Sequence, residues 1–280
     1  MRIVRAEEIE EAVRRLAIEV NYFADAGLRE SLRKALEREE SELGREILER
    51  LLENMEVAAL EKIPLCQDTG VVIVSLEIGR EVSVEGDLYE AINRGVARGY
   101  REGYLRGSIV GNPLFERRNT GDNTPAIIHV DLIGGDRLRL TLMAKGAGAE
   151  NMSRLTVLKP SEGLEGVENF VLKTVAEAGA NACPPLIIGV GIGGTFDSVG
   201  WLAKKALLRG MGVRNTDPRY AELELRLLDK VNKLGIGPMG VGGRVTALDL
   251  RIEAAPSHIA SLPVAVNLDC HAHRVRRIEL

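Results

Sequence analysis

The sequence has only three cysteines, few aromatic residues and no long apolar run. Aromatic residues make up 4% of the 280 positions, so a base-stacking surface for nucleic acid is not expected. The basic residues are spread along the chain and the net charge is −4, which gives no reason to expect a nucleic-acid partner. No apolar stretch reaches the length that crosses a bilayer, and the first residues lack the apolar core of a signal peptide. These absences argue against nucleic-acid and membrane partners and favour a cytoplasmic location.

Length and composition indicate an ordinary globular protein. Hydrophobic residues make up 45% and charged residues 28% of the 280 positions, values typical of a chain that buries a full core. The chain contains no internal repeat and no linker-like stretch that would mark a domain boundary. The sequence therefore predicts a single domain over residues 1–280.

The three cysteines stand far apart, and each lies in a turn-rich setting. Cys66 occurs in Pro-Leu-Cys-Gln-Asp-Thr-Gly, Cys183 in Asn-Ala-Cys-Pro-Pro, and Cys270 in Asn-Leu-Asp-Cys-His. In the cytoplasm an odd number of cysteines argues against a disulfide framework and for metal binding or catalysis. Iron–sulfur cubane clusters normally take four thiolates. Three would leave one iron open to bind water or substrate, as catalytic metal sites do.

Other interpretations of the cysteines stay open. Lone cysteines are often inert and buried, and no compact Cys-x-x-Cys spacing supports a shared metal. His271 and His273 follow Cys270 closely, and these three residues could bind zinc together with Cys66 or Cys183. A cysteine–histidine nucleophile is a further alternative, but it would leave two of the three cysteine loops unexplained.

Apolar periodicity predicts a helical N-terminal segment over about residues 1–60, followed by strands and helices. Residues 126–133 and 137–144 alternate apolar and polar positions across a Gly-Gly-Asp turn, which predicts a hairpin. The expected fold class is mixed α/β (α+β), with partly antiparallel sheets flanked by helices. Each cysteine is expected at a strand boundary, where functional loops gather. The predicted helices cover residues 6–25, 28–60 as two helices or one bent helix, 87–105 with Asp87 as N-cap, 161–179, 197–210 and 217–234. The further strands cover 71–78, 186–190, 245–254 and 262–267.

A glycine motif in the second half resembles a dinucleotide-binding fingerprint. Residues 189–194 read Gly-Val-Gly-Ile-Gly-Gly, which matches G-x-G-x-x-G after a predicted strand. The fingerprint also requires an acidic residue at the end of the next strand, whereas the nearest one, Asp217, is expected to cap a helix. A nucleotide-dependent oxidoreductase is thus an alternative for which the required acidic residue is missing. The other interpretation is that these glycines let backbone amides and a helix N-terminus approach an anion or a cluster closely.

Several polar residues near the cysteines are candidates for the same site. Asp68 lies two residues after Cys66 and could act as a general base or beside a metal ligand, or simply as a turn residue. His258 lies in a polar turn and is the better site candidate among the histidines outside the Cys270 segment. The stretch over residues 111–123 suits a functional loop, and residues 145–151 suit a loop that approaches another group closely.

Five motifs occur in one order along the chain. They are Pro64–Gly70, Arg118–Pro125, Lys145–Asn151, Ala182–Pro185 with the glycines that follow, and Pro263–Asn267 before Cys270. Together, from about Ile9 to the C-terminus, they resemble the iron–sulfur (class I) fumarate hydratase and L-tartrate dehydratase family. The resemblance is to the alpha subunit, or N-terminal half, of that family.

The resemblance implies a cofactor and a substrate site. It implies a 4Fe–4S cluster held by Cys66, Cys183 and Cys270, whose open iron binds the substrate. It also implies that Gln67 and Asp68 contact the substrate, and that Asp68 takes part in moving the C3 proton. Further substrate-binding residues implied by the family are Arg106, which would grip a carboxylate, Gly148 and His258.

The resemblance also implies a reaction and a partner. The expected reaction is the reversible hydration of fumarate to L-malate, a step of the tricarboxylic acid cycle, with L-tartrate dehydration as the alternative. Fused family members continue beyond the point where this chain ends, so a separate beta subunit is expected to complete the active site in an α2β2 heterotetramer. A non-catalytic binding or scaffold subunit with structural cysteines is the alternative from another class.

Overall fold

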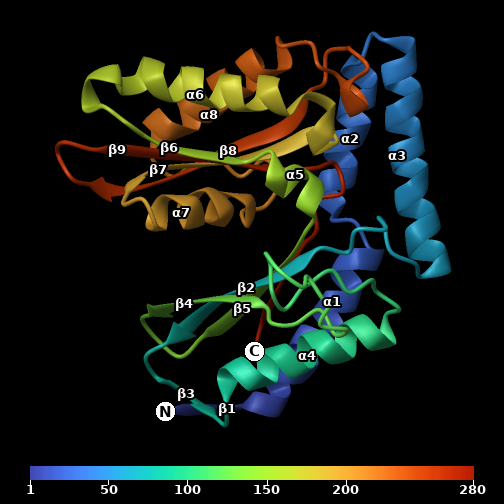
Figure 1. Ribbon diagram of the computed structural model, residues 1–280, viewed down its shortest axis with the longest axis vertical. Coiled ribbons are helices and arrows are strands. Elements are labelled where there is room, and N and C mark those ends of the chain that lie inside the picture. Colours follow the sequence, from blue (N-terminus) through green and yellow to red (C-terminus); the bar gives the residue numbers. More distant parts are fainter. The chain divides into compact units, whose positions relative to one another are not determined.

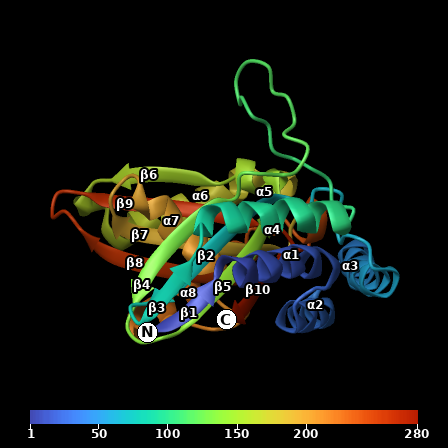
Figure 2. The same ribbon diagram turned by 90° about the horizontal axis from the view of Figure 1, so that it is seen from below.

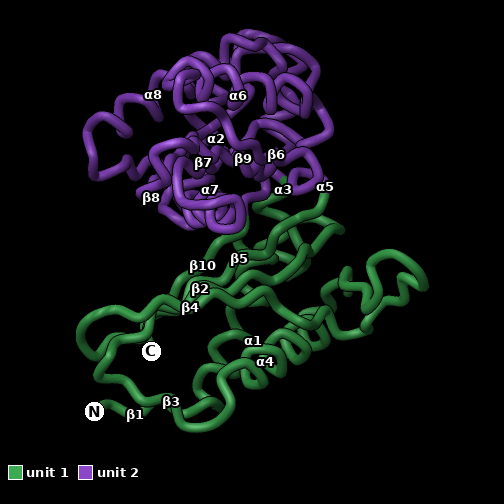
Figure 3. Tube along the Cα trace, turned by 60° about the vertical axis from the view of Figure 1, so that its left-hand side comes forward, with its two compact units in different colours: residues 1–25, 54–147, 274–280 green, residues 26–53, 148–273 purple.

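The computed structural model describes residues 1–280 (Figure 1). The chain divides into two compact units, shown in Figure 3. Unit 1 comprises residues 1–25, 54–147 and 274–280, and unit 2 comprises residues 26–53 and 148–273. The single domain predicted over residues 1–280 stays a prediction, because two compact units can still act as one catalytic body. Each unit is described by itself.

Unit 1 is built on a mixed four-stranded sheet in the order β10-β5-β2-β4. Its central strand β2 (Val71–Gly79) is antiparallel to β5 (Leu138–Lys145) and parallel to β4 (Ile127–Ile133). The C-terminal strand β10 (Val275–Glu279) adds to β5 in antiparallel fashion. The other elements of this unit are helices α1 (Ala6–Tyr22) and α4 (Leu88–Glu102) and the short parallel pair β1 (Arg2–Arg5) and β3 (Val82–Glu85).

The hairpin predicted over residues 126–144 is wrong. β4 and β5 are not neighbours, because β2 lies between them and pairs with both. The apolar character of β2 explains the difference. This strand is buried along nearly its whole length, and a continuous apolar strand is more stable in the middle of a sheet than at its edge. The expected antiparallel pairing is confirmed, but between β2 and β5 and between β5 and β10.

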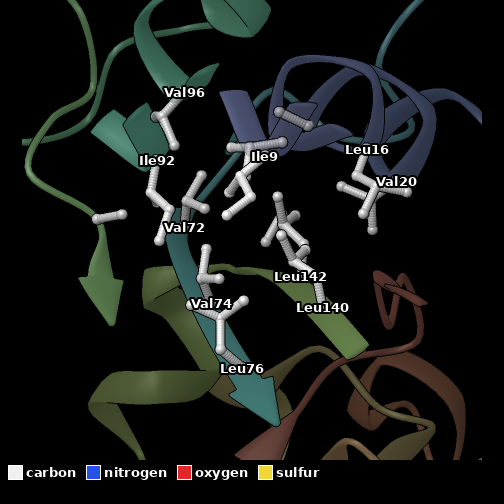
Figure 4. Close-up of a cluster of buried hydrophobic side chains, with 14 of the residues drawn as sticks. Ile9, Leu16, Val20, Val72, Val74, Leu76, Ile92, Val96, Leu140 and Leu142 are labelled. Atoms are coloured by element: carbon white, nitrogen blue, oxygen red, sulfur yellow. The ribbon is translucent and has the colours of Figure 1, made fainter. Parts of the chain in front are cut away.

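Helices α1 and α4 pack against each other and against this sheet. Ile9, Leu16 and Val20 lie at helical spacing on α1 and are buried. Figure 4 shows them facing apolar side chains of β2 and β5. Asp87 caps α4 as predicted, since its carboxylate accepts a hydrogen bond from the Glu90 amide at 3.0 Å. The core that these elements share fixes both the sheet and the start of β2.

Unit 2 contains a second mixed sheet, in the order β6-β9-β7-β8. β7 (Leu186–Gly194) is parallel to β8 (Ala247–Ser257) and antiparallel to β9 (Leu262–Asp269), which pairs with β6 (Arg154–Leu158). Helices α6 (Gly163–Ala178) and α8 (Pro218–Asn232) cover one face and α7 (Ser198–Leu207) the other (Figure 1). The remaining elements are α2 (Ala26–Arg38), α3 (Glu42–Glu61), in which the division between the units falls, α5 (Ala147–Asn151), and the 3₁₀ helices η1 (Pro160–Glu162), η2 (Gly179–Ala182) and η3 (Pro238–Gly240).

The predicted fold class is confirmed. Residues 28–60, expected as two helices or one bent helix, form the two helices α2 and α3. The sequence does not predict β1, β3, β6 or β10, which have four or five residues each. Strands this short carry too few alternating positions to be recognised. No helix in the structure is both long and apolar enough to cross a membrane.

The glycine motif at residues 189–194 does not form a dinucleotide-binding loop. It lies entirely within β7, whereas a fingerprint places its glycines in the turn between strand and helix. A Cβ on Gly189 would overlap the Ala203 carbonyl oxygen, and a Cβ on Gly191 would lie 2.7 Å from the Ala203 amide nitrogen. Gly189 and Gly191 therefore allow the close approach of α7 to β7. The approach of an anion or a cluster to this motif stays a prediction.

This packing predicts the effect of added methyl groups. Gly191→Ala should destabilise the protein by about 1–3 kcal/mol, because α7 must move away from β7. The matched control is Gly200→Ala in α7, where the nearest atom to a new Cβ lies 3.8 Å away; it should be neutral or stabilising by up to about 1 kcal/mol. Denaturant unfolding measures both. Equal stability of the two variants would contradict the packing role of Gly191.

Candidate active site

The first cysteine lies in a loop whose carbonyl groups are bonded by side chains from other parts of unit 1. Residues 64–70 connect α3 to β2 and carry Cys66. Buried carbonyl groups need hydrogen-bond donors. Four carbonyls of this loop receive side-chain donors: Leu65 from Asn54 Nδ2 at 2.9 Å, Asp68 from Arg274 Nη1 at 2.7 Å, Thr69 from the Tyr100 hydroxyl at 2.7 Å, and Gly70 from Asn123 Nδ2 at 3.1 Å.

Gly70 lets the loop enter β2 in close contact with β5. Its φ of 78° lies in the left-handed region, which glycine adopts without steric cost. A Cβ at this position would lie 2.7 Å from the carbonyl carbon and oxygen of Lys145. The glycine that ends the first cysteine motif is thus required both by backbone conformation and by space.

Both carboxylate oxygens of Asp68 accept hydrogen bonds from backbone amides. Oδ1 accepts from the Gly70 amide at 3.0 Å and Oδ2 from the Ala147 amide at 2.7 Å. Each carboxylate oxygen can accept a further bond, so the half-buried carboxylate is oriented and can still take a proton. Gln67 beside it is exposed, and its Oε1 accepts a hydrogen bond from the Cys66 thiol at 3.4 Å.

The long segment between α4 and β4 carries Arg106 and supports the cysteine loop (Figure 2). The Arg106 carbonyl accepts a hydrogen bond from Thr69 Oγ1 at 2.7 Å, while the Arg106 side chain is exposed. Asn123 is fully buried; its Oδ1 accepts from the Ser108 amide at 2.7 Å, and its Nδ2 donates to Gly70. Both ends of this segment therefore hold the loop that contains Cys66, Gln67 and Asp68.

The second and third cysteine loops meet in unit 2. Cys183 has a φ of 54° and directly precedes the Pro184–Pro185 pair at the start of β7, while Cys270 directly follows β9. The Cys183 carbonyl accepts a hydrogen bond from the His271 amide at 3.3 Å, and His271 Nδ1 lies 3.1 Å from the same oxygen. A Cβ on Gly148 would lie 3.7 Å from the Asn181 carbonyl, so Gly148 borders the Cys183 loop. Unit 2 thus brings Cys183, Cys270 and Gly148 to one end of its sheet.

The histidines after Cys270 both have partners. His271 contacts the Cys183 carbonyl, and Nδ1 of the buried His273 lies 2.5 Å from Asp269 Oδ2. These contacts fix the turn that follows β9. They engage one ring nitrogen of each histidine, and the zinc alternative would have to use the other.

His258 lies at the opposite end of the unit 2 sheet. Cys183 precedes β7 and Cys270 follows the antiparallel β9, so both lie where β7 begins. His258 follows β8, which runs parallel to β7 and ends beside the end of β7. Since β7 has nine residues, the two ends are about 30 Å apart. His258 is therefore not brought to the cysteines of its own unit; it lines a pocket of about 430 Å³ with Ile192, Tyr220 and Leu262.

The donor set fits a soft metal. None of the three cysteines forms a disulfide, and all three are partly exposed. Thiolates select zinc and iron–sulfur clusters over magnesium or calcium. Cys66 belongs to unit 1 and the other two to unit 2, and no group of three or more His, Cys, Asp and Glu side chains lies at metal-binding distance. Unit 1 thus offers one cysteine ligand and unit 2 offers two, and each lies in a loop held by hydrogen bonds.

Comparison with known proteins identifies the family. The family model described as fumarate hydratase (fumerase) matches residues 10–279. The chain belongs to the fumarate hydratase family. A Methanocaldococcus jannaschii protein provisionally named L(+)-tartrate dehydratase subunit alpha is 43% identical over 98% of both chains. The L(+)-tartrate dehydratase subunit alpha of Escherichia coli (strain UTI89) is 35% identical over 88% of this chain and 82% of its own length.

Sequence reasoning missed the residues that position the Cys66 loop in this fumarate hydratase family member. Tyr100 lies within α4 and Asn54 within α3, where the sequence predicts only helix. One signal was present for Asn123, which belongs to the polar stretch predicted as a functional loop. The side chain of Tyr100 is 2% exposed, and burial raises its pKa to about 12.

Tyr100 gives a testable prediction about stability. Tyr100→Phe removes the hydroxyl that donates to Thr69 O and Gly70 O, so it should cost about 1–3 kcal/mol of unfolding free energy. The raised pKa favours the protonated form in the folded state, so this stabilisation is full below about pH 10 and is lost as the pH rises through about 12. Denaturant unfolding from pH 8 to 12 measures both effects.

The matched control for this variant is Tyr104→Phe, because Tyr104 is 91% exposed. It should leave the unfolding free energy unchanged and keep the loss of stability above pH 10. If Tyr104→Phe and Tyr100→Phe behave alike at pH 8, the hydroxyl of Tyr100 does not hold the cysteine loop.

Proposed function

We propose that this chain is the alpha subunit of an iron–sulfur hydro-lyase that reversibly hydrates fumarate to L-malate. The observation that carries the proposal is the Cys66-Gln67-Asp68 loop, in a chain of the fumarate hydratase family. There a soft ligand is followed at once by an exposed amide and by a carboxylate that two backbone amides orient. Dehydration of a hydroxy acid needs a base for the proton and help for the departing hydroxide.

Cys66, Cys183 and Cys270 would hold a 4Fe–4S cluster between them. When bound, the cluster supplies an open iron that acts as a Lewis acid toward the substrate hydroxyl. The support for this assignment is chemical: three cysteines at strand boundaries, none in a disulfide, of which Cys183 and Cys270 lie in loops joined through His271.

The other residues would bind the substrate and move its proton. Asp68 would take the C3 proton, since its two amide bonds leave a lone pair on each oxygen. Arg106 is exposed, and its backbone carbonyl is bonded to the loop; its guanidinium would suit a two-point contact with a substrate carboxylate. Gln67 would contribute its amide to the same substrate. Gly148 would allow close approach next to the Cys183 loop. His258, at the other end of the unit 2 sheet, would not contact a substrate bound beside Cys183 and Cys270 of the same chain.

L-tartrate is the second candidate substrate, because the relatives from M. jannaschii and E. coli are named as tartrate dehydratase subunits. Both substrates are four-carbon dicarboxylates, and they differ by one hydroxyl. The same residues would bind either carboxylate pair. Parallel assays with L-malate, fumarate and L-tartrate decide between the two activities. The proposal is refuted if the enzyme turns over none of these three compounds.

A beta subunit would complete the enzyme. The relatives are named as alpha subunits, which supports a non-identical partner for this chain. We expect an α2β2 assembly in the cytoplasm, with further substrate contacts supplied by the partner. Co-expression followed by mass measurement tests the stoichiometry, and an isolated chain with full activity would remove the need for a partner.

Replacement of the cysteines tests the cofactor. Cys66→Ser, Cys183→Ser and Cys270→Ser should each abolish the cluster and lower the hydro-lyase activity below detection. The measurement is iron and acid-labile sulfide after anaerobic reconstitution, with about four of each expected per wild-type chain. A variant with wild-type sulfide content would remove that cysteine from the site. Stoichiometric zinc without sulfide in the wild type would favour the zinc alternative, and unchanged metal content in all three variants would favour the scaffold alternative.

Replacement of Asp68 separates proton transfer from cluster binding. Asp68→Asn should keep the iron and sulfide content but lower kcat by about 100-fold or more, because an amide cannot take the proton. The matched control is Asp87→Asn, since asparagine caps a helix as well as aspartate does; it should keep wild-type kcat. Undiminished turnover in Asp68→Asn would assign the base to another residue.

A further inference from the structure

Arg274 is a buried arginine without an ion-pair partner. It is 3% exposed and precedes β10, and its carbonyl accepts a hydrogen bond from the Ala144 amide at 3.0 Å. Its Nη1 donates to the Asp68 carbonyl at 2.7 Å and to Asn21 Oδ1 at 2.9 Å. The fully buried Arg251 differs, because its Nε contacts Asp249 Oδ2 at 2.9 Å. A buried cation without a counter-charge is unfavourable unless a nearby negative charge compensates it.

The candidate for that negative charge is the carboxylate of Asp68. A Cβ added to Gly146 would lie 3.3 Å from Arg274 Nη2 and also 3.3 Å from Asp68 Oδ2. Gly146 therefore lies between the guanidinium and the carboxylate, and its lack of a side chain keeps the space between them open. No hydrogen bond joins Nη2 to a protein acceptor.

The other loop carbonyls show that a cation is not needed for the hydrogen bond itself. Leu65, Thr69 and Gly70 receive their side-chain donors from neutral groups. Only the carbonyl of Asp68 is held by a charged donor. What arginine adds at this place is thus its positive charge, directed at the residue that would handle the proton.

We infer that Arg274 is a positioning residue for Asp68 in the hydro-lyase site. It fixes the Asp68 backbone so that the carboxylate meets the Gly70 and Ala147 amides, and it places a positive charge where Asp68 and a dianionic substrate come together. This inference rests on the proposed function. It assigns Arg274 no direct contact with the reacting atoms.

The test compares Arg274→Gln and Arg274→Lys with a matched control. Arg276→Gln is the control, because Arg276 Nη2 also donates to a backbone carbonyl, that of Phe23 at 2.9 Å, outside the cysteine loop. Arg274→Gln should lower kcat on the order of 100-fold, as misplaced catalytic groups do, with a smaller change in KM and wild-type iron and sulfide content. Arg274→Lys should recover part of kcat because it restores the charge. Arg276→Gln should keep wild-type kcat even if its melting temperature falls as far as that of Arg274→Gln.

A second measurement does not depend on activity. A thiol-alkylating reagent is applied to the metal-free chain, and the rate at Cys66 is divided by the rate at Cys183. Arg274→Gln should raise this ratio severalfold above the wild-type value, because the Cys66 loop has lost one of its hydrogen bonds. If Arg274→Gln does not fold, Arg274→Lys and Gly146→Ala carry the same comparison. Wild-type kcat together with an unchanged alkylation ratio in the Arg274 variants overturns the inference alone. A wild-type enzyme without sulfide or turnover removes the proposed function, and the inference with it.

Discussion

The structure of unit 1 depends on the hydrogen-bond donors that the carbonyl groups of one loop require. The carbonyl groups of residues 64–70 cannot pair within a sheet or a helix, so they need donors from elsewhere. Those donors come from α3, α4, the segment before β4 and the residue before β10. These elements are far apart in the sequence and meet only when the sheet and its helices have packed. The conformation of the Cys66 loop is therefore a property of the whole unit and not of its own seven residues.

This arrangement separates polar groups that are committed to the structure from those that remain available. Tyr100 and Asn123 are buried, and their hydrogen-bond donors are used by loop carbonyls. Gln67 and Arg106 are exposed, and both lie on or beside that loop. Asp68 stands between the two groups, since its oxygens are oriented by amides and can still accept another bond. Such preorganisation is what an enzyme needs in order to stabilise developing charge without rearranging.

How far the sequence predicts this structure depends on the range of the interactions. The helices follow from apolar spacing and caps such as Asp87, which are local, and the cysteine loops were expected at strand boundaries for the same reason. The neighbours of β2 depend on pairings between distant strands, so the local pattern around residues 134–136 predicts a hairpin that the sheet does not contain. The glycine motif of β7 shows the same limit: its spacing matches a nucleotide motif, but the partner that requires Gly189 and Gly191 is α7. The anchors of the Cys66 loop were missed because a tyrosine within a helix gives no sign of where its hydroxyl points.

The choice between malate and tartrate depends on which polar side chains are available to meet the additional hydroxyl of tartrate. An enzyme recognises one additional hydroxyl strongly only through a hydrogen-bonding group placed to meet it, because an unmatched polar group in the site is costly. In unit 1, the side chains of Asn54, Tyr100 and Asn123 already hold loop carbonyls and cannot take this role without releasing the loop. Arg106 suits a carboxylate, which both substrates carry. Gln67 remains, with its Oε1 facing the Cys66 thiol and an amide group that holds no part of the loop. Among the residues proposed to contact the substrate, Gln67 would therefore be the one in the cysteine loop that is placed to discriminate the hydroxyl, directly beside the cysteine that would bind the iron.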